Sequence, residues 1–230
     1  MNQPFQTTYE TSGELIAVRH RVLRNTYWLL ALSMIPTVLG AWIGVQMSFS
    51  FMSGSPFLGF LAFMAIAFGF FYVIERTKNS PIGIAVLLGF TFFMGLMLSR
   101  MIGHILHFSN GASLIMTAFG GTAIVFATMA SIATTSKRDF SGLSSWLFAG
   151  VIVILLAAVA NIFLQMPALQ IVISAIAIVI FSAYILFDVQ RVINGGETNY
   201  ISATLAIYLS LYNVFVNLLA LLGIFGGERD

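Results

Sequence analysis

Seven long apolar runs, separated by short polar segments, are the feature of this sequence that most constrains its fold. About 20 apolar helical residues cross the roughly 30 Å hydrocarbon core of a bilayer, and in lipid a helix pairs its backbone groups internally. With 59% of residues hydrophobic and 8% charged, a soluble core could not enclose so much apolar surface. The sequence therefore predicts an all-α membrane protein, a bundle of seven transmembrane helices at Tyr27–Met47, Phe57–Ile74, Ile82–Leu98, Gly111–Ala133, Leu143–Gln165, Ala168–Phe187 and Ile201–Phe225.

The boundary between the fifth and sixth runs needs its own argument, because little polar sequence separates them. A single helix over residues 143–187 would be about 67 Å long, which exceeds the thickness of any bilayer. Pro167 lies at the midpoint of this stretch. Because proline interrupts a helix and restricts the residue before it, we expect the chain to turn there.

Positive charge is distributed unequally between the loops, and this predicts the orientation. One side of the predicted bundle carries eight Lys and Arg residues, and the other carries Arg100 and Arg229. We therefore expect residues 1–26 to form a cytoplasmic tail, residues 27–230 to form the transmembrane domain, and the C-terminus to lie outside. The scattered charges predict no nucleic-acid groove. The eight residues are Arg19, Arg21, Arg24, Arg76, Lys78, Lys137, Arg138 and Arg191.

The tail before the first run has a helical pattern of its own. Thr11-Ser12-Gly13-Glu14 resembles a capping box, and Leu15, Val18 and Val22 recur at helical spacing after it. This pattern is compatible with an amphipathic helix on the cytoplasmic leaflet or with a simple extension of the first spanning helix. We expect about ten residues before this helix to be disordered.

A few ionisable residues lie within or beside the apolar runs, where they are rare and often functional. Asp188 at the end of the sixth run is either a proton- or cation-sensing carboxylate or a helix-end group that reaches water or pairs with Arg191. Arg100 is interpreted as an arginine that extends to the membrane interface. His104 and His107 lack a third ligand nearby, so they predict no metal site.

The seventh run carries small and polar residues on one helical face. Such side chains on a membrane helix face other helices, so we expect this helix to be central in the bundle. The face either lines a polar cavity or packs closely with interhelical hydrogen bonds. A similar face of small residues on the fourth run is interpreted as packing. The first face comprises Ala203, Ala206, Ser210, Asn213, Asn217 and Ala220, and the second Gly120, Ala123, Ala127 and Ala130.

Catalytic motifs are missing from the sequence, which has no cysteine and no HExxH, P-loop, GxGxxG or GxSxG pattern. Asp188 is the only aspartate within or beside the apolar runs, so no intramembrane aspartyl dyad can form there. We expect a protein without enzymatic activity, cofactor or bound metal.

Several segments resemble one membrane-protein family. Residues 181–188 (FSAYILFD) resemble the sixth-helix signature of the Bax inhibitor-one family, also called TMBIM. Two further segments closely resemble its bacterial YccA-type branch, namely residues 195–201 (GGETNYI) and 207–215 (IYLSLYNVF). Shorter similar segments are residues 22–27 (VLRNTY), 119–123 (FGGTA) and 160–165 (ANIFLQ), so the resemblance covers nearly the whole chain.

This resemblance implies a fold and a function. Members have seven helices, the last enclosed by the other six. The YccA-type branch lies in the bacterial inner membrane, where it binds and modulates FtsH, a membrane-anchored ATP-dependent protease, together with HflK and HflC. Other members are pH-sensitive calcium leaks whose sensor is a pair of aspartates on the sixth and seventh helices.

Carried over to this chain, the two sensor positions are Asp188 and Ser210. Ser210 departs from the family pattern, because a serine cannot share a proton with a carboxylate. Calcium favours six to eight oxygen ligands, so Asp188 alone predicts weak calcium binding. The latch arginine of the leaks maps loosely to Arg76 or Lys78, while Arg191 follows Asp188. The resemblance therefore favours a modulator of FtsH, with the tail as a substrate handle, and a calcium or proton leak is the alternative.

Overall fold

The structure is a computed structural model that describes residues 5–49 and 55–227, with side chains from Val18 onward. Each of the seven α-helices in the described ranges is long and apolar enough to cross a membrane, which confirms the predicted bundle. In chain order the elements are α1 (Phe5–Gln46), α2 (Pro56–Thr77), α3 (Pro81–Leu106), α4 (Gly111–Thr135), the short 3-10 turn η1 (Ser141–Leu143), α5 (Ser144–Leu164), α6 (Pro167–Ile193) and α7 (Tyr200–Gly226).

The turn between α5 and α6 lies where the proline predicts it. Gln165 adopts a left-handed conformation with φ 51° and caps α5, and Pro167 is the first residue of α6. Proline suits this position because its missing N–H would have no partner in the first helical turn. The side-chain oxygen of Asn161 accepts a hydrogen bond from the Met166 N–H at 3.0 Å and stabilises the connection.

Two helices continue further than their apolar runs predict. The third ends at Leu106 instead of Leu98, and the sixth ends at Ile193 instead of Phe187. Polar residues such as Arg100 and Asp188 therefore lie inside helices. The apolar run marks only the part of a helix that crosses the hydrocarbon, and the helix can continue past it with polar residues.

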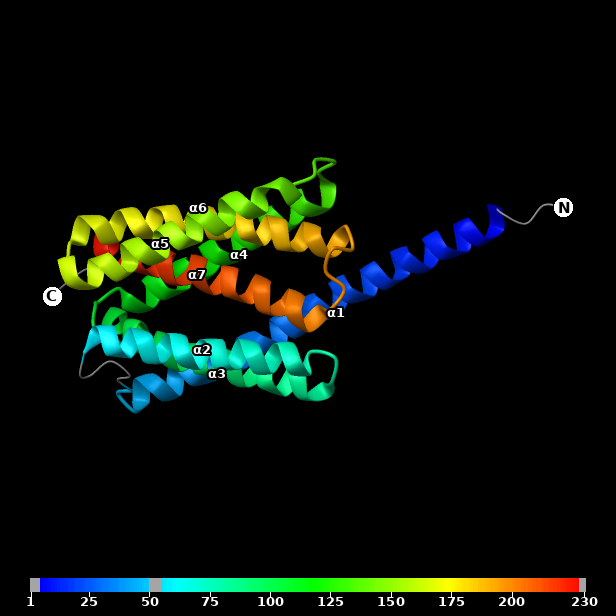
Figure 1. Ribbon diagram of the computed structural model, residues 1–230. Coiled ribbons are helices and arrows are strands. Elements are labelled where there is room, and N and C mark those ends of the chain that lie inside the picture. The colour runs from blue at the N-terminus through cyan, green and yellow to red at the C-terminus, as the bar shows by residue number, and fades with distance from the viewer. Residues whose placement is uncertain (1–4, 50–54, 228–230) are drawn as a thin grey trace.

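The tail is a direct extension of the first spanning helix. α1 runs without a break for 42 residues, which is about 63 Å, and its N-terminal part projects well beyond the bundle (Figure 1). The continuous helix excludes a separate surface helix, and Thr11 lies inside it instead of at its start. The expected disorder is wrong for residues 5–10, which are helical, while residues 1–4 lie outside the described part.

The last helix occupies the centre of the bundle, as the small and polar face predicts. α7 contacts α1, α2, α3, α4 and α6, and of its residues only Ile224 and Phe225 are exposed (Figure 1). Tyr208, Ile207 and Val214 on this helix are at most 1% exposed. The enclosure differs from the expectation in one respect, because α5 packs on α6 and α2 and does not contact α7.

The contact between α1 and α3 depends on glycine. A Cβ atom at Gly95 would collide with the carbonyl oxygen of Thr37, and one at Gly40 with the carbonyl oxygen of Phe92. A Cβ atom at Gly44 would collide with the side chain of Ser99. The two backbones approach this closely because no side chain separates them, as small residues allow in membrane helices.

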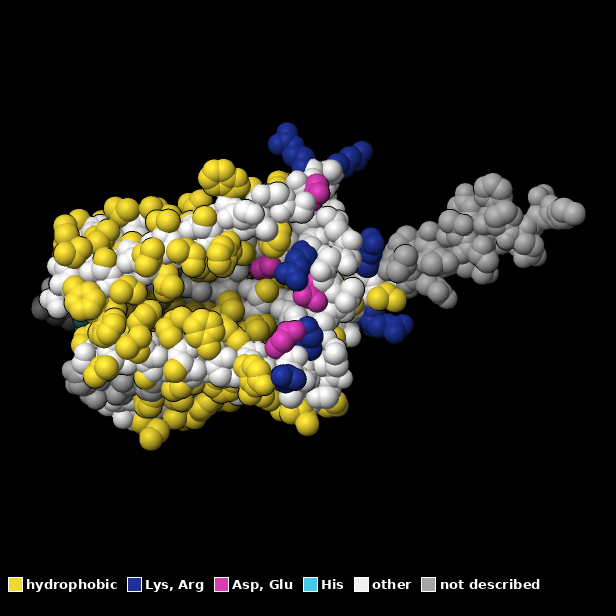
Figure 2. Space-filling model, in the orientation of Figure 1, with side chains coloured by type: hydrophobic (Ala, Val, Ile, Leu, Met, Phe, Trp, Pro, Cys, Tyr) yellow, Lys and Arg dark blue, Asp and Glu magenta, His cyan; other side chains and the backbone are white. Residues whose placement is uncertain are grey.

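Charged side chains gather at one end of the molecule, while hydrophobic side chains cover most of the remaining visible surface (Figure 2). This end holds the loops that join α2 to α3, α4 to α5 and α6 to α7, and α1 leaves the bundle there (Figure 1). Large apolar residues such as Trp28 and Trp146 are 73% and 80% exposed. Such a surface is compatible with hydrocarbon and not with water.

Candidate functional site

The sensor candidate Asp188 is buried inside α6, with only 7% of its surface exposed. It lies five residues before the end of that helix, so it is not the helix-end residue that the apolar run predicts. The charged side chains that act on it electrostatically are Arg191 and Glu197. A buried carboxylate in a membrane helix is costly unless polar groups surround it, which is why this position is a functional candidate.

The cations expected beside Asp188 are held by other groups. Arg191 forms its ion pair with Glu197, with a distance of 3.1 Å between Nη2 and Oε2. Lys78 pairs with Glu75, and the Arg76 guanidinium lies over the Tyr72 ring at 5.3 Å from its centroid. The ion pairs found in the described part of the chain therefore do not include the predicted pair of Asp188 with Arg191.

The second sensor position, Ser210, is buried on α7 and 4% exposed. It lies ten residues, or about 15 Å, into α7, whereas Asp188 lies about 8 Å from the adjacent end of α6. The two helices pack together, and each of these positions lies well inside its helix. The structure thus supplies a buried hydroxyl, and not a carboxylate, at the second sensor position.

The two asparagines on the polar face of α7 form hydrogen bonds within their own helix. The side-chain amide of Asn213 donates to the Leu209 carbonyl at 2.8 Å, and that of Asn217 donates to the Asn213 carbonyl at 2.8 Å. These bonds are neither interhelical nor directed at a cavity. The pocket on this helix is lined instead by Tyr208, Leu211, Tyr212 and Phe215, on another face.

The small residues of α4 do not pack as predicted. A Cβ atom at Gly120 would meet no atom within 4 Å, and Ala123 and Ala127 are exposed. The interpretation of this face as an internal packing surface is therefore wrong for most of its length. It borders an open groove between α1 and α4, two helices whose backbones stay apart.

Two amide side chains that sequence reasoning missed hold the loops at the charged end together. Gln190 on α6 donates to the Arg138 carbonyl and accepts from the Phe140 N–H, both at 2.7 Å, so it fixes the loop after α4. Asn199 caps α7 by accepting from the Ile201 and Ser202 N–H groups. Its amide also donates to the Lys78 carbonyl at 3.0 Å. The position of Asn199 before an apolar run is a recognisable N-cap signal, whereas Gln190 carries none.

The base of the tail rests on the same group of loops. Gly195 adopts φ +80°, and a Cβ atom there would come within 2.8 Å of the Arg19 Nε atom. Arg19 and His20 line a small cavity of about 130 Å³ with Leu23 and Ile193. The start of the spanning part of α1 is thus positioned by the α6–α7 loop.

The histidine pair is exposed near the opposite end of the molecule. His104 lies in the last turn of α3 with its ring edge-on to Phe108, and His107 follows the helix. Within residues 5–49 and 55–227, no three His, Asp or Glu side chains are grouped so that they could hold a metal ion.

Comparisons with known proteins agree with the motifs. The family model described as inhibitor of apoptosis-promoting Bax1 matches residues 19–227. The chain is 41% identical over 204 residues to a protein of Escherichia coli (strain K12) named modulator of FtsH protease YccA, covering 89% of this chain and 90% of that protein. It is 36% identical over 224 residues to a membrane protein of Vibrio cholerae, covering 97% and 98%. An uncharacterized protein of Neisseria meningitidis is 37% identical over 212 residues, covering 91% and 93%.

Proposed function

The chain belongs to the family of the inhibitor of apoptosis-promoting Bax1, and on that premise we propose that it is an inner-membrane protein that binds and modulates the FtsH protease. The observation that carries this proposal is the 41% identity to the Escherichia coli modulator of FtsH over nine-tenths of both chains. The relatives are named as modulators or inhibitors. We propose accordingly that this chain acts by binding and not by catalysis.

The shape of the bundle suits such a partner. α1 extends about 63 Å, roughly twice the thickness of the hydrocarbon core, so about half of it projects from the membrane. In the proposed mechanism the helices dock beside the membrane segments of the protease, and this projecting helix is the handle that its ATP-driven channel engages. The glycine contact between α1 and α3 opposes extraction of the first helix. The chain would thus occupy the protease without rapid degradation.

The orientation follows from the charged end. We propose that this end, with the projecting part of α1, lies in the cytoplasm, because positive loops remain there. Seven helices then leave the C-terminus in the periplasm. Alkaline phosphatase fused after Asp230 should be active, because that enzyme folds only in an oxidising compartment. An inactive but stably expressed fusion would contradict the orientation.

The proposed function is tested by isolating the tagged chain from native membranes in mild detergent and identifying its partners by mass spectrometry. FtsH should be recovered together with HflK and HflC, which we propose as further members of the complex. Purified FtsH should then degrade a membrane substrate more slowly when the chain is added. The proposal is wrong if FtsH is not recovered and the degradation rate is unchanged.

The handle is tested separately by deleting residues 2–11. The truncated chain should still be isolated with FtsH, because the transmembrane helices bind it, but FtsH-dependent turnover of the chain should slow. Equal half-lives of the full and truncated chains in cells with active FtsH would contradict the handle and leave the membrane contact in place.

A further inference from the structure

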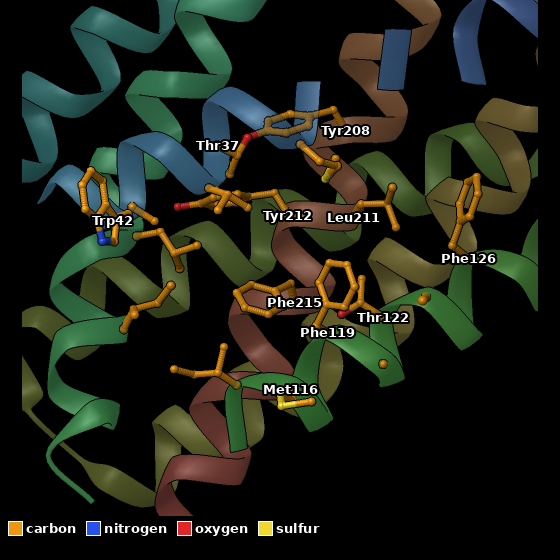
Figure 3. A pocket seen from close by; sticks show the side chains of 18 of the residues that line it. Thr37, Trp42, Met116, Phe119, Thr122, Phe126, Tyr208, Leu211, Tyr212 and Phe215 are labelled. Carbon is orange, nitrogen blue, oxygen red and sulfur yellow. The ribbon is translucent and has the colours of Figure 1, made fainter. Parts of the chain in front are cut away.

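A lateral groove of about 760 Å³ opens between α1 and α4, and α3 and α7 line its inner side (Figure 3). It exists because the backbones of α1 and α4 stay apart, although both helices pack against α7. Its rim is exposed at Trp42, Met116 and Phe119, which are 61%, 75% and 62% exposed. In a bilayer these side chains face lipid, so the groove opens towards the hydrocarbon core.

The lining is uncharged along its whole length. The tyrosine hydroxyls on its inner side already have partners within the protein, so neither requires a polar ligand. The Tyr208 hydroxyl shares a hydrogen bond of 2.9 Å with Thr37, and the Tyr212 hydroxyl donates to the Met94 carbonyl at 3.2 Å. Figure 3 shows Thr37 directed towards Tyr208. The chemistry of the lining is therefore complementary to an alkyl chain.

The groove is closed at one end and polar at the other. The Tyr27 and Phe126 rings meet edge to face, with centroids 5.8 Å apart, at the end nearest the charged loops. The α1 residues that line the groove continue to Gln46, 19 residues or about 28 Å further along. At this open end the exposed Trp42 indole and Gln46 amide offer hydrogen-bond donors, as side chains at the headgroup level of a membrane do.

The shape of the groove decides between the two apolar occupants that a membrane offers. The contact between the Tyr27 and Phe126 rings at the closed end would obstruct a transmembrane helix that crosses the whole bilayer. A thin, flexible alkyl chain fits a groove with a single open end.

We propose that the groove binds one acyl chain of a phospholipid from the leaflet at the Gln46 end, with the headgroup beside Trp42 and Gln46. The bound chain fills the gap between α1 and α4 and becomes part of the packing of the bundle. This proposal is independent of the proteolytic partner, because it concerns only the surface that the chain presents to lipid.

The experiment fills the groove with a side chain. A Cβ atom at Gly120 meets nothing within 4 Å, so Gly120→Leu adds a side chain beside the groove without a clash at its first atom. Gly69→Leu is the matched control, because Gly69 on α2 is equally open and does not line the groove. The full chain is reconstituted in vesicles of palmitoyl-oleoyl phosphatidylethanolamine and phosphatidylglycerol, extracted in mild detergent and examined by native mass spectrometry.

Wild type and Gly69→Leu should each retain one phospholipid per chain. The fraction of Gly120→Leu chains that retain a phospholipid should be at least tenfold lower. A second pair tests the same point on one helix, since Ala123→Phe enters the groove and Ala127→Phe lies outside its lining. Equal retention across a folded pair, no retained lipid in wild type, or a second polypeptide in place of the lipid would overturn the proposal.

Discussion

Of two surfaces rich in small residues in this molecule, one is packed closely against another helix and the other is left open. On α1 and α3, Gly40, Gly44 and Gly95 bring two backbones together so closely that a single added carbon would collide with the neighbouring helix. On α4, Gly120 and Ala123 border an open groove. Small residues permit close approach, but they do not create it, because a helix must also present a complementary surface at the same depth.

The α1–α3 contact also shows what makes a surface complementary. Gly40 and Gly44 are four residues apart on one face of α1, which is the GxxxG spacing of close helix pairs. Gly95 and Ser99 repeat that spacing on α3, and each set lies against the other. On the groove side α1 presents large side chains such as Trp42 and Val38 opposite the small residues of α4, and these leave no room for close approach.

The largest effect should come from adding one methyl group to each surface. Gly95→Ala places a carbon against the Thr37 carbonyl and should destabilise the bundle by about 1–3 kcal/mol, because a close-packed backbone cannot move aside. Gly120→Ala should be neutral or stabilise by up to about 1 kcal/mol, since alanine favours the helix and meets open space. Thermal unfolding in mild detergent measures both, and equal melting temperatures would remove the distinction between the surfaces.

A somewhat smaller effect should come from the junction between the α2–α3 and α6–α7 loops. Asn199→Ala removes the cap of α7 and the link to the Lys78 carbonyl, and we expect a loss of about 1–2 kcal/mol. Asn194→Ala is the matched control, because Asn194 is an exposed residue at the end of α6 in the same loop. The same unfolding measurement applies. If Asn194→Ala melts at as low a temperature as Asn199→Ala, the loss of stability comes from the loop in general and not from the cap.

Measuring ion flux tests whether calcium passes through the bundle. Asn213 and Asn217 of α7 bond to their own helix, and Ser210 stands in place of a second carboxylate, so we expect a weak calcium leak that changes little between pH 6 and 8. Asp188→Asn should change it little, and Ser210→Asp should introduce a pH dependence by adding an acid. Calcium-dye influx into liposomes measures the leak. A large pH-gated flux in wild type that Asp188→Asn abolishes would favour the channel function.

The smallest effect should lie in the exposed loop after α4. The Ser141 N–H and hydroxyl both donate to the Asp139 carboxylate at 2.9 Å and lower its pKa below the ordinary value of 3.8. A lowered pKa stabilises the folded loop above the unfolded value, and this contribution is lost as the pH falls through the folded pKa. Ser141→Ala removes the hydroxyl bond and keeps the larger contribution of the backbone N–H, so it should reduce a slight acid sensitivity of this loop. Amide exchange of residues 139–141 at pH 3 and pH 6 would detect it.

Some site residues were predictable from the sequence and others were not. Asp188 is recognisable because a carboxylate beside an apolar run is rare, and Ser210 because small and polar residues share one face of the last helix. The partners of the nearby cations were not predictable, because Arg191 is three residues from Asp188 in the chain but bonds to Glu197 in space. The role of Gln190 depends on two backbone groups that lie 52 and 50 residues away.

The sequence by itself determined the number of helices, their approximate ends, the turn at Pro167 and the central place of α7. These properties depend on hydrophobicity and backbone chemistry, which act locally along the chain. Only the tertiary structure decided which small-residue face would be covered, which ion pairs would form and where a groove would remain. Each of those outcomes depends on a helix that is distant in sequence, on its depth in the bundle and on the size of its side chains. Neither property can be predicted from a single run of residues.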